Sequence, residues 1–203
     1  MELAKKYCVG EGIEIGGSAG NAFPGINSKN VDLGDESWEF YKAEQIKESG
    51  DYMPIDIQAN GDEIPVDNGS QDFVINSHVI EHFENPIKAM VEWDRVTKIG
   101  GHIFIIAPHK ERTFDKEKPR TKLSEVVQKW KEKVPNSDHS KHFGIWITRD
   151  FINLINWMTA TGVVKWKIIE IEDQDSKIGN GFTVVCQKME NLNGEKGIKT
   201  VKK

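Results

Sequence analysis

The chain has 203 residues, a formal net charge of -5 and 37% hydrophobic residues. This length suffices for one hydrophobic core, and the composition excludes a fibrous repeat or a largely disordered chain. The basic residues are dispersed or lie in the C-terminal tail, whereas nucleic-acid binding usually needs a basic patch. We therefore expect no nucleic-acid partner.

Cysteine content and hydropathy indicate the compartment. Cys8 and Cys186 lie far apart and without metal-type spacing, which fits a reducing compartment better than a disulfide-stabilised secreted domain. The first residues contain no apolar signal core, and no segment approaches the ~20 apolar residues of a membrane span. We expect a cytoplasmic protein without a membrane partner, and the sequence indicates no oligomeric state.

Short apolar segments alternate with helical patterns in the first half of the chain. We expect strands at residues 13–15, 30–33, 53–57, 73–75 and 103–107. Strands that alternate with helices are typical of a mostly parallel sheet covered by helices. The last of these segments is apolar throughout, which indicates a central strand buried on both faces.

Two helices have clear boundaries. Asn85 can cap the first, Pro86 fits its first position, and Gly100-Gly101 is expected to end it. Thr148 can cap the second, beyond whose end Gly162 lies and in which four apolar residues share one helical face. These are Phe151, Leu154, Ile155 and Met158. Strands at 163–172 and 182–187 should follow, joined by a loop whose Asn180-Gly181 is a hairpin signal.

The segment 109–147 interrupts the alternation directly after the central strand. It is charged and irregular, apart from one helical face formed by Leu123, Val126, Val127 and Trp130. Ligands of open α/β sheets bind outside the carboxyl ends of the strands, so an insertion at this place is expected to cover the site as a cap. We expect a single domain over residues 1–190 that includes this cap, and a flexible tail over 191–203.

A glycine-rich turn follows the first strand, in Glu14-Ile-Gly-Gly-Ser-Ala-Gly20. Its spacing is not G-x-G-x-x-G, which argues against a nicotinamide dinucleotide. Pro24 and Gly25 interrupt the helix that should follow, so residues 21–29 are expected to form mostly loop. Glycines let a ligand approach the backbone, and Asp32, at the end of the next strand, can accept hydrogen bonds from ribose hydroxyls.

Further motifs follow in a recognisable order. They are Ile64-Pro65-Val66, Asp72-Phe73-Val74, Ser77-His78-Val79-Ile80-Glu81-His82 and Glu92-Trp93-Asp94-Arg95-Val96-Thr97-Lys98-Ile99-Gly100-Gly101. With the glycine turn, this order resembles class I S-adenosylmethionine-dependent methyltransferases of the methyltransferase type 11-like family. The resemblance spans Gly10 to about Lys188.

The resemblance implies an α/β, doubly wound Rossmann-like fold, with a seven-stranded, mostly parallel sheet and an antiparallel last strand. It also implies that S-adenosyl-L-methionine lies across the strand ends. The implied contacts are Glu14, Gly16 and Gly17 at the methionine moiety, Asp32 at the ribose, Asn60 or Asp62 at the adenine, and Ser77 with His78 beside the sulfonium. The choice between Asn60 and Asp62 stays open. The cofactor carries no phosphate, so a curtailed helix after the turn is tolerable.

Methyl transfer needs an aligned nucleophile, and a general base only where that nucleophile carries a proton. The candidate catalytic residues are His78, His109 and His142. The candidate substrate contacts in the cap are His109, Asp115, Arg120, His139 and His142. The polar, histidine-containing cap favours a small polar metabolite, a sugar or a glycan precursor as the acceptor.

Two other interpretations stay open. The altered glycine turn is compatible with a binding protein that has the fold without catalysis. The histidines of the cap allow a metal-dependent enzyme that uses His109, His139 and His142. However, the pair at 139 and 142 lacks a convincing third ligand, and a catalytic zinc site usually has three protein ligands. We therefore expect no metal ion.

Overall fold

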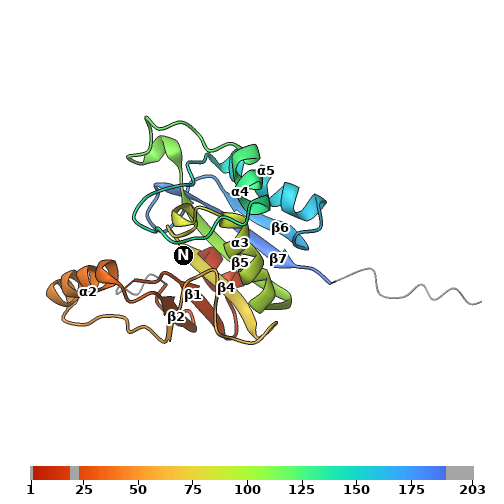
Figure 1. Cartoon of the computed structure of the whole chain (residues 1–203). Coiled ribbons are helices and arrows are strands. Elements are labelled where there is room, and N and C mark those ends of the chain that lie inside the picture. Colours follow the sequence, from red (N-terminus) through yellow and green to blue (C-terminus); the bar gives the residue numbers. More distant parts are fainter. Residues whose placement is uncertain (1, 19–22, 191–203) are drawn as a thin grey trace, which may run out of the picture.

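The computed structural model describes residues 2–18 and 23–190. Its seven-stranded sheet has the order β3-β2-β1-β4-β5-β7-β6 (Figure 1). The strands are β1 (Gly12–Ile15), β2 (Ser28–Asp32), β3 (Ile57–Gln58), β4 (Gln71–Ser77), β5 (Thr97–Pro108), β6 (Trp166–Glu172) and β7 (Gly181–Lys188). Strands β1 to β5 pair in parallel, and β7 is antiparallel to both neighbours. The predicted fold class is confirmed.

Helices cover both faces of the sheet unequally. They are α1 (Glu2–Tyr7), α2 (Glu36–Ser49), α3 (Pro86–Val96), α4 (Leu123–Lys131) and α5 (Thr148–Ala160), with short 3-10 turns η1 (Ile80–His82) and η2 (Lys110–Arg112). The main core lies between the sheet and α3, α4 and α5. A smaller core on the other face includes α1 and Phe23. Helix α2 stands apart at the β2 side of the sheet (Figure 1).

The central strand explains the two cores. Ile103 and Ile105 of β5 pack in the main core, whereas Phe104 and Ile106 pack in the smaller one. Successive side chains of a strand point to opposite faces, so a continuously apolar segment must be covered twice. The prediction that 103–107 is buried on both faces is confirmed.

Two predicted boundaries were wrong. Of the predicted strand 53–57, only Ile57 is in a strand, β3. Pro54 has no N–H to donate, and its carbonyl accepts a hydrogen bond from Asn30 Nδ2 at 3.1 Å. Helix α3 ends at Val96, not at Gly100-Gly101. Thr97 is already extended, and its hydroxyl donates to the Trp93 carbonyl at 2.6 Å, which closes the helix there.

The other predicted helices and strands form in the described ranges, with some boundaries shifted by a few residues. The second predicted helix is α5, whose apolar face is buried, although Thr148 is its first residue and Ile147 precedes it as the cap position. The hairpin of β6 and β7 forms as expected, but β6 begins only at Trp166. Residues 23–27 contain no helix. The tail at 191–203 and residues 19–22 lie outside the described residues. In the described ranges, no helix has both the length and the apolarity that a bilayer crossing requires.

Asn85 caps α3 and also holds the cap segment. Its Oδ1 accepts a hydrogen bond from Lys88 N at 3.2 Å, and its Nδ2 donates to the Val134 carbonyl at 3.2 Å. Asn85→Ala is therefore expected to lower the free energy of unfolding by about 1–2 kcal/mol. Urea denaturation measures this change. Asn153→Ala, at an exposed position of α5, is the control and should cost less than about 0.5 kcal/mol; an equal loss in both variants contradicts the capping role.

Candidate functional site

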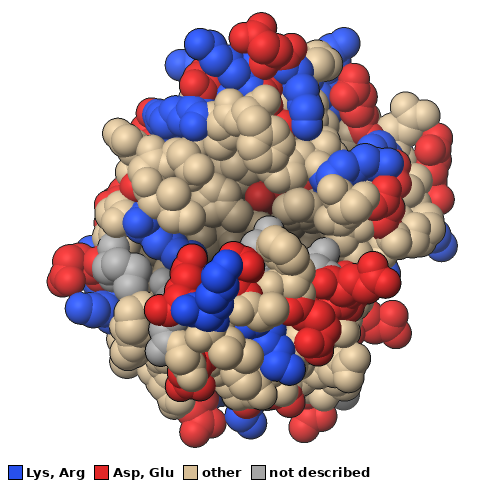
Figure 2. Space-filling model, turned by 90° about the vertical axis from the view of Figure 1, so that its left-hand side faces the viewer, with Lys and Arg blue, Asp and Glu red and all other residues tan. Residues whose placement is uncertain are grey.

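A cavity of about 1130 Å³ lies at the carboxyl ends of the parallel strands. One side is lined by the last residue of β1, Ile15, and by Gly16 after it, by Asp32 of β2, and by Ser77 and His78 at the end of β4. Residues 136–140 of the cap line the other. Figure 2 views the molecule from the side of α2 and shows a hollow near the centre, with charged side chains of both signs at its rim. The cavity is where a parallel α/β sheet binds its ligands.

The turn after β1 needs glycine at both positions. Gly16 has a φ of +63°, and a Cβ there would lie 2.7 Å from Val79 Cγ2. Gly17 donates its N–H to Asn30 Oδ1 at 3.2 Å, and a Cβ on it would lie 2.6 Å from the same oxygen. No side chain of Gly16 or Gly17 therefore covers the backbone of this turn. The turn borders a smaller cavity of about 490 Å³ that Glu14 and Lys177 also line.

Glu14 is a buried carboxylate beside this bare turn. It is 2% exposed, and its Oε2 has no hydrogen-bond partner among the described residues. Burial raises the pKa of Glu14 to about 7, although the positive charge of Lys177 opposes the shift. A buried carboxylate oxygen without a partner is costly, and a cationic group of a ligand would offset that cost.

Asp32 ends β2 and lies on the cavity wall. Its Oδ1 accepts a hydrogen bond from Leu33 N at 2.7 Å, and its Oδ2 accepts one from Ser18 N at 3.2 Å. Burial raises its pKa, and these backbone donors oppose the shift. Each carboxylate oxygen can accept more than one hydrogen bond, so Asp32 can still bind two hydroxyl groups.

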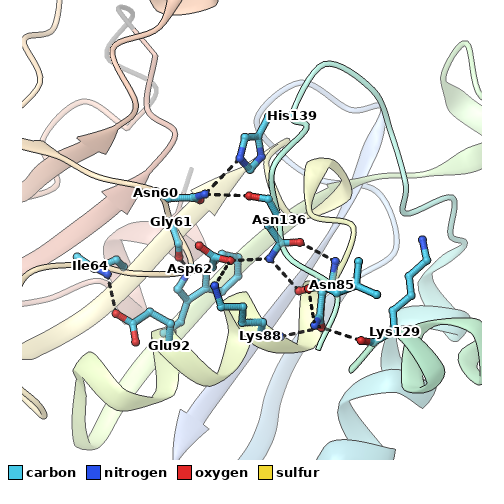
Figure 3. Close-up of polar contacts among 12 residues, drawn as sticks. Asn60, Gly61, Asp62, Ile64, Asn85, Lys88, Glu92, Lys129, Asn136 and His139 are labelled. Atoms are coloured by element: carbon cyan, nitrogen blue, oxygen red, sulfur yellow. Dashed lines mark hydrogen bonds and ion pairs between the residues drawn. The ribbon is translucent and has the colours of Figure 1, made fainter. Parts of the chain in front are cut away.

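The structure separates the two candidates for the adenine contact (Figure 3). Asn60 lines the cavity, and its Nδ2 donates to the Asn136 carbonyl at 3.2 Å and lies 3.3 Å from His139 Nε2. Asp62 is buried beneath it and does not line the cavity; its Oδ2 is 2.8 Å from Lys88 Nζ and 2.7 Å from Asn136 Nδ2. Asn136 thus fastens the cap to the loop that carries both residues.

Ser77 and His78 follow β4 at the centre of the sheet. His78 has a φ of +58°, unusual for a residue with a side chain, and its N–H donates to the Ile106 carbonyl at 2.9 Å. In the described part of the chain, neither Ser77 Oγ nor His78 Nε2 has a hydrogen-bond partner. Burial lowers the pKa of His78, which favours a neutral ring that can accept a proton.

The predicted substrate contacts divide into three groups. His139 lines the cavity. Asp115 and His142 do not line the cavity: His142 packs against the lining residue His82, and Asp115 Oδ2 lies 2.5 Å from His142 Nδ1. His109 and Arg120 do not line the cavity: His109 Nδ1 accepts a hydrogen bond from Glu111 N at 3.2 Å, and Arg120 pairs with Asp150 at 3.5 Å. The structure does not bring these last two residues to the cavity.

Sequence reasoning missed Glu81 and His82. His82 lines the cavity, and Glu81 behind it is fully buried, with no hydrogen bond from any described residue to either carboxylate oxygen. Its Oε1 lies 3.9 Å from His78 Nδ1, 3.8 Å from His82 Nε2 and 3.9 Å from His142 Nε2. Burial raises the pKa of Glu81 to about 8. The spacing H-x-x-E-H over residues 78–82 is the signal in the sequence that could have identified these two residues.

Comparisons with known proteins agree with this geometry. Residues 12–105 match the model of a family described as "Methyltransferase domain". No curated protein sequence matches the chain.

Solved structures share the fold at low sequence identity. A SAM-dependent methyltransferase from Aquifex aeolicus is similar over 93% of this chain and 88% of its own, with 16% identity and a TM-score of 0.53. One from Thermotoga maritima covers 93% and 86%, with 18% identity and a TM-score of 0.55. One from Methanosarcina mazei covers 94% and 99%, with 14% identity and a TM-score of 0.58.

Proposed function

We propose that the chain is a class I S-adenosylmethionine-dependent methyltransferase, in line with the family match over residues 12–105 and the fold it shares with solved methyltransferases. We also propose that it methylates a small polar metabolite, a sugar or a glycan precursor held under the cap. The observation that carries the proposal is the cavity at the ends of β1, β2 and β4, whose opposite wall is polar. That wall consists of Asn136, Ser137, Asp138, His139 and Ser140. Hydroxyl, carboxylate, amide and imidazole groups suit an acceptor with several hydrogen-bonding groups.

The residues at the strand ends fit the parts of the cofactor. Glu14 offers an oxygen, Oε2, that has no hydrogen-bond partner among the described residues to the ammonium group of the methionine moiety, beside the backbone of Gly16 and Gly17. Asp32 offers two oxygens to the ribose hydroxyls, and Asn60 is the one of the two adenine candidates that lines the cavity. When bound, S-adenosylmethionine supplies a methyl group on a sulfonium.

His78 is the proposed general base where the acceptor carries a proton. It lines the cavity directly after β4, and burial lowers its pKa, so the ring is neutral at physiological pH. A base acts best when it is unprotonated at the working pH and within hydrogen-bond reach of the acceptor.

Isothermal titration calorimetry with S-adenosylmethionine and with its demethylated product tests cofactor binding. We expect binding of both, followed by methyl transfer to members of a panel of sugars, nucleotide sugars and small polar metabolites. Absence of binding at millimolar concentration would reject the enzyme in favour of a binding protein that only retains the fold. Transfer to proteins alone would reject the small-acceptor proposal.

Two variants separate the adenine candidates. Asn60→Ala is expected to weaken cofactor binding about 5- to 12-fold, because one neutral hydrogen bond contributes about 1–1.5 kcal/mol. Asp62→Asn keeps the shape of a residue that does not line the cavity. The affinity for the cofactor should therefore change less than 2-fold, which corresponds to about 0.4 kcal/mol or less. Calorimetry measures both, and the reverse order would assign the adenine contact to Asp62.

A further inference from the structure

We propose that Glu81, His82 and His142 bind a divalent transition-metal ion at the wall of the cavity, and that this ion holds a hydroxyl group of the acceptor. Metal binding is independent of the proposed function, whereas the role toward the acceptor depends on it. The proposal differs from the set predicted from the sequence, because only His142 is common to the two.

The ligand atoms are close enough for one ion. Glu81 Oε1 lies 3.8 Å from His82 Nε2 and 3.9 Å from His142 Nε2, and one ligand atom from each residue lies within 4.8 Å of the others. Zinc binds nitrogen and carboxylate oxygen at about 2.0–2.2 Å, which places ligand atoms about 3.4 Å apart in a tetrahedral site. Small rotations of the side chains would close the site.

Glu81 provides an independent reason for an ion. Its side chain is completely buried, and in the described ranges no donor satisfies either carboxylate oxygen. Among the described residues, no lysine or arginine lies within ion-pair distance of Glu81; the basic side chains near its carboxylate are those of His78, His82 and His142. A buried carboxylate without a partner is costly unless it binds a proton or a cation, and the three histidines around Glu81 leave it well placed to share a cation with them.

His142 is oriented as metal-bound histidines usually are. Asp115, itself buried, places its Oδ2 2.5 Å from His142 Nδ1 and pairs through Oδ1 with Lys118 at 2.6 Å. A carboxylate that accepts the proton of one ring nitrogen leaves the other nitrogen free to bind metal, and such second-layer carboxylates are common around zinc. His142 Nε2 is the nitrogen that faces Glu81.

The backbone holds the two parts of the site together. Phe143 N and Gly144 N donate to the Glu81 carbonyl at 2.7 and 3.0 Å, so the cap segment that carries His142 is fastened to η1. The rings of His82 and His142 pack edge to face with centroids 4.7 Å apart. The ligands are therefore positioned by main-chain contacts from segments about sixty residues apart in the sequence.

An ion at this site would face the acceptor. His82 and His78 line the cavity, and three protein ligands leave a position open for substrate, as in catalytic sites. A hydroxyl bound there has a lowered pKa. Its proton would pass to His78, its oxygen would form the bond to the methyl carbon, and the carbon–sulfur bond would break with its electron pair remaining on sulfur. Two imidazoles and one carboxylate favour Zn²⁺, Fe²⁺, Co²⁺ or Ni²⁺.

Titration of the full chain with Co²⁺, without a histidine tag, tests the site by visible absorption, and Zn²⁺ calorimetry supplies the affinity. We expect one ion per chain. Glu81→Gln and His142→Gln should each weaken binding by at least about 100-fold, and Asp115→Asn by about 10- to 100-fold. His102→Gln, on β5 and outside the cluster, should bind like the parent. Circular dichroism checks folding, and His82→Gln replaces any variant that does not fold.

Parent-like affinity in both Glu81→Gln and His142→Gln, or no binding of Co²⁺ by the parent at about 100 μM, overturns the metal site. Two further readouts separate this failure from failure of the proposed function. Calorimetry with the demethylated cofactor, in the absence of metal, tests the proposed function. If a chain that binds Co²⁺ still transfers the methyl group to a hydroxyl acceptor after the metal is chelated, only the role of the ion toward the acceptor is overturned.

Discussion

Asp32→Ala is expected to weaken the binding of S-adenosylmethionine by about 100-fold or more, because hydrogen bonds to a charged carboxylate are worth about 1.5–3 kcal/mol each and the ribose offers two hydroxyls. Asp32 ends β2 on the cavity wall and is partly desolvated, which strengthens such bonds. Calorimetry measures the change.

Two variants control for lost structure at Asp32. Asp32→Asn retains the shape and one acceptor oxygen, so its loss should be smaller, about 10-fold. Asp67→Ala, in an exposed loop away from the cavity, should bind like the parent. Unchanged affinity in Asp32→Ala would show that the ribose does not lie at the end of β2.

Glu14→Gln is expected to raise the free energy of unfolding of the cofactor-free chain at pH 8 by about 3 kcal/mol, and to change it little at pH 4. Burial raises the pKa of Glu14 from its ordinary value of 4.5 to about 7 in the folded chain. The folded state therefore binds more protons than the unfolded state between these values. The stability of the parent falls as the pH rises through this window, and glutamine removes the fall because it does not ionise.

Urea denaturation at a series of pH values measures the effect. Glu11→Gln, at an exposed position just before β1, is the control and should leave the pH profile of the parent unchanged. A Glu14→Gln variant that is less stable than the parent at pH 8 would mean that the ionised carboxylate makes a net favourable contact, for instance with Lys177, whose charge acts on Glu14.

Local sequence patterns predicted most of the fold. The apolar segment of β5, the Asn85 cap of α3 and the buried face of α5 each depend on neighbours within a few residues. Helix α2 was missed because its apolar residues, such as Trp38, Phe40 and Ile46, form no single stripe along 36–49. Its N-terminus is marked by Asp35, whose Oδ1 accepts a hydrogen bond from Trp38 N at 3.2 Å.

The candidate site was predictable where it lies at strand ends. Asp32, Ser77 and His78 meet at the cavity because carboxyl ends of adjacent parallel strands lie at one edge of the sheet. The cap was not predictable residue by residue. Whether His109 or His142 approaches the site depends on long-range contacts, such as the hydrogen bonds from 143–144 to the Glu81 carbonyl, which leave no pattern in the sequence.

A crystal structure with S-adenosylhomocysteine bound tests the central claim most directly. The account predicts the ribose hydroxyls on Asp32, the amino group at Glu14, and the sulfur beside Ser77 and His78. It also predicts that the acceptor side of the sulfur opens toward His82 and the cap wall. A cofactor bound elsewhere, or one whose ribose makes no contact with Asp32, would contradict it.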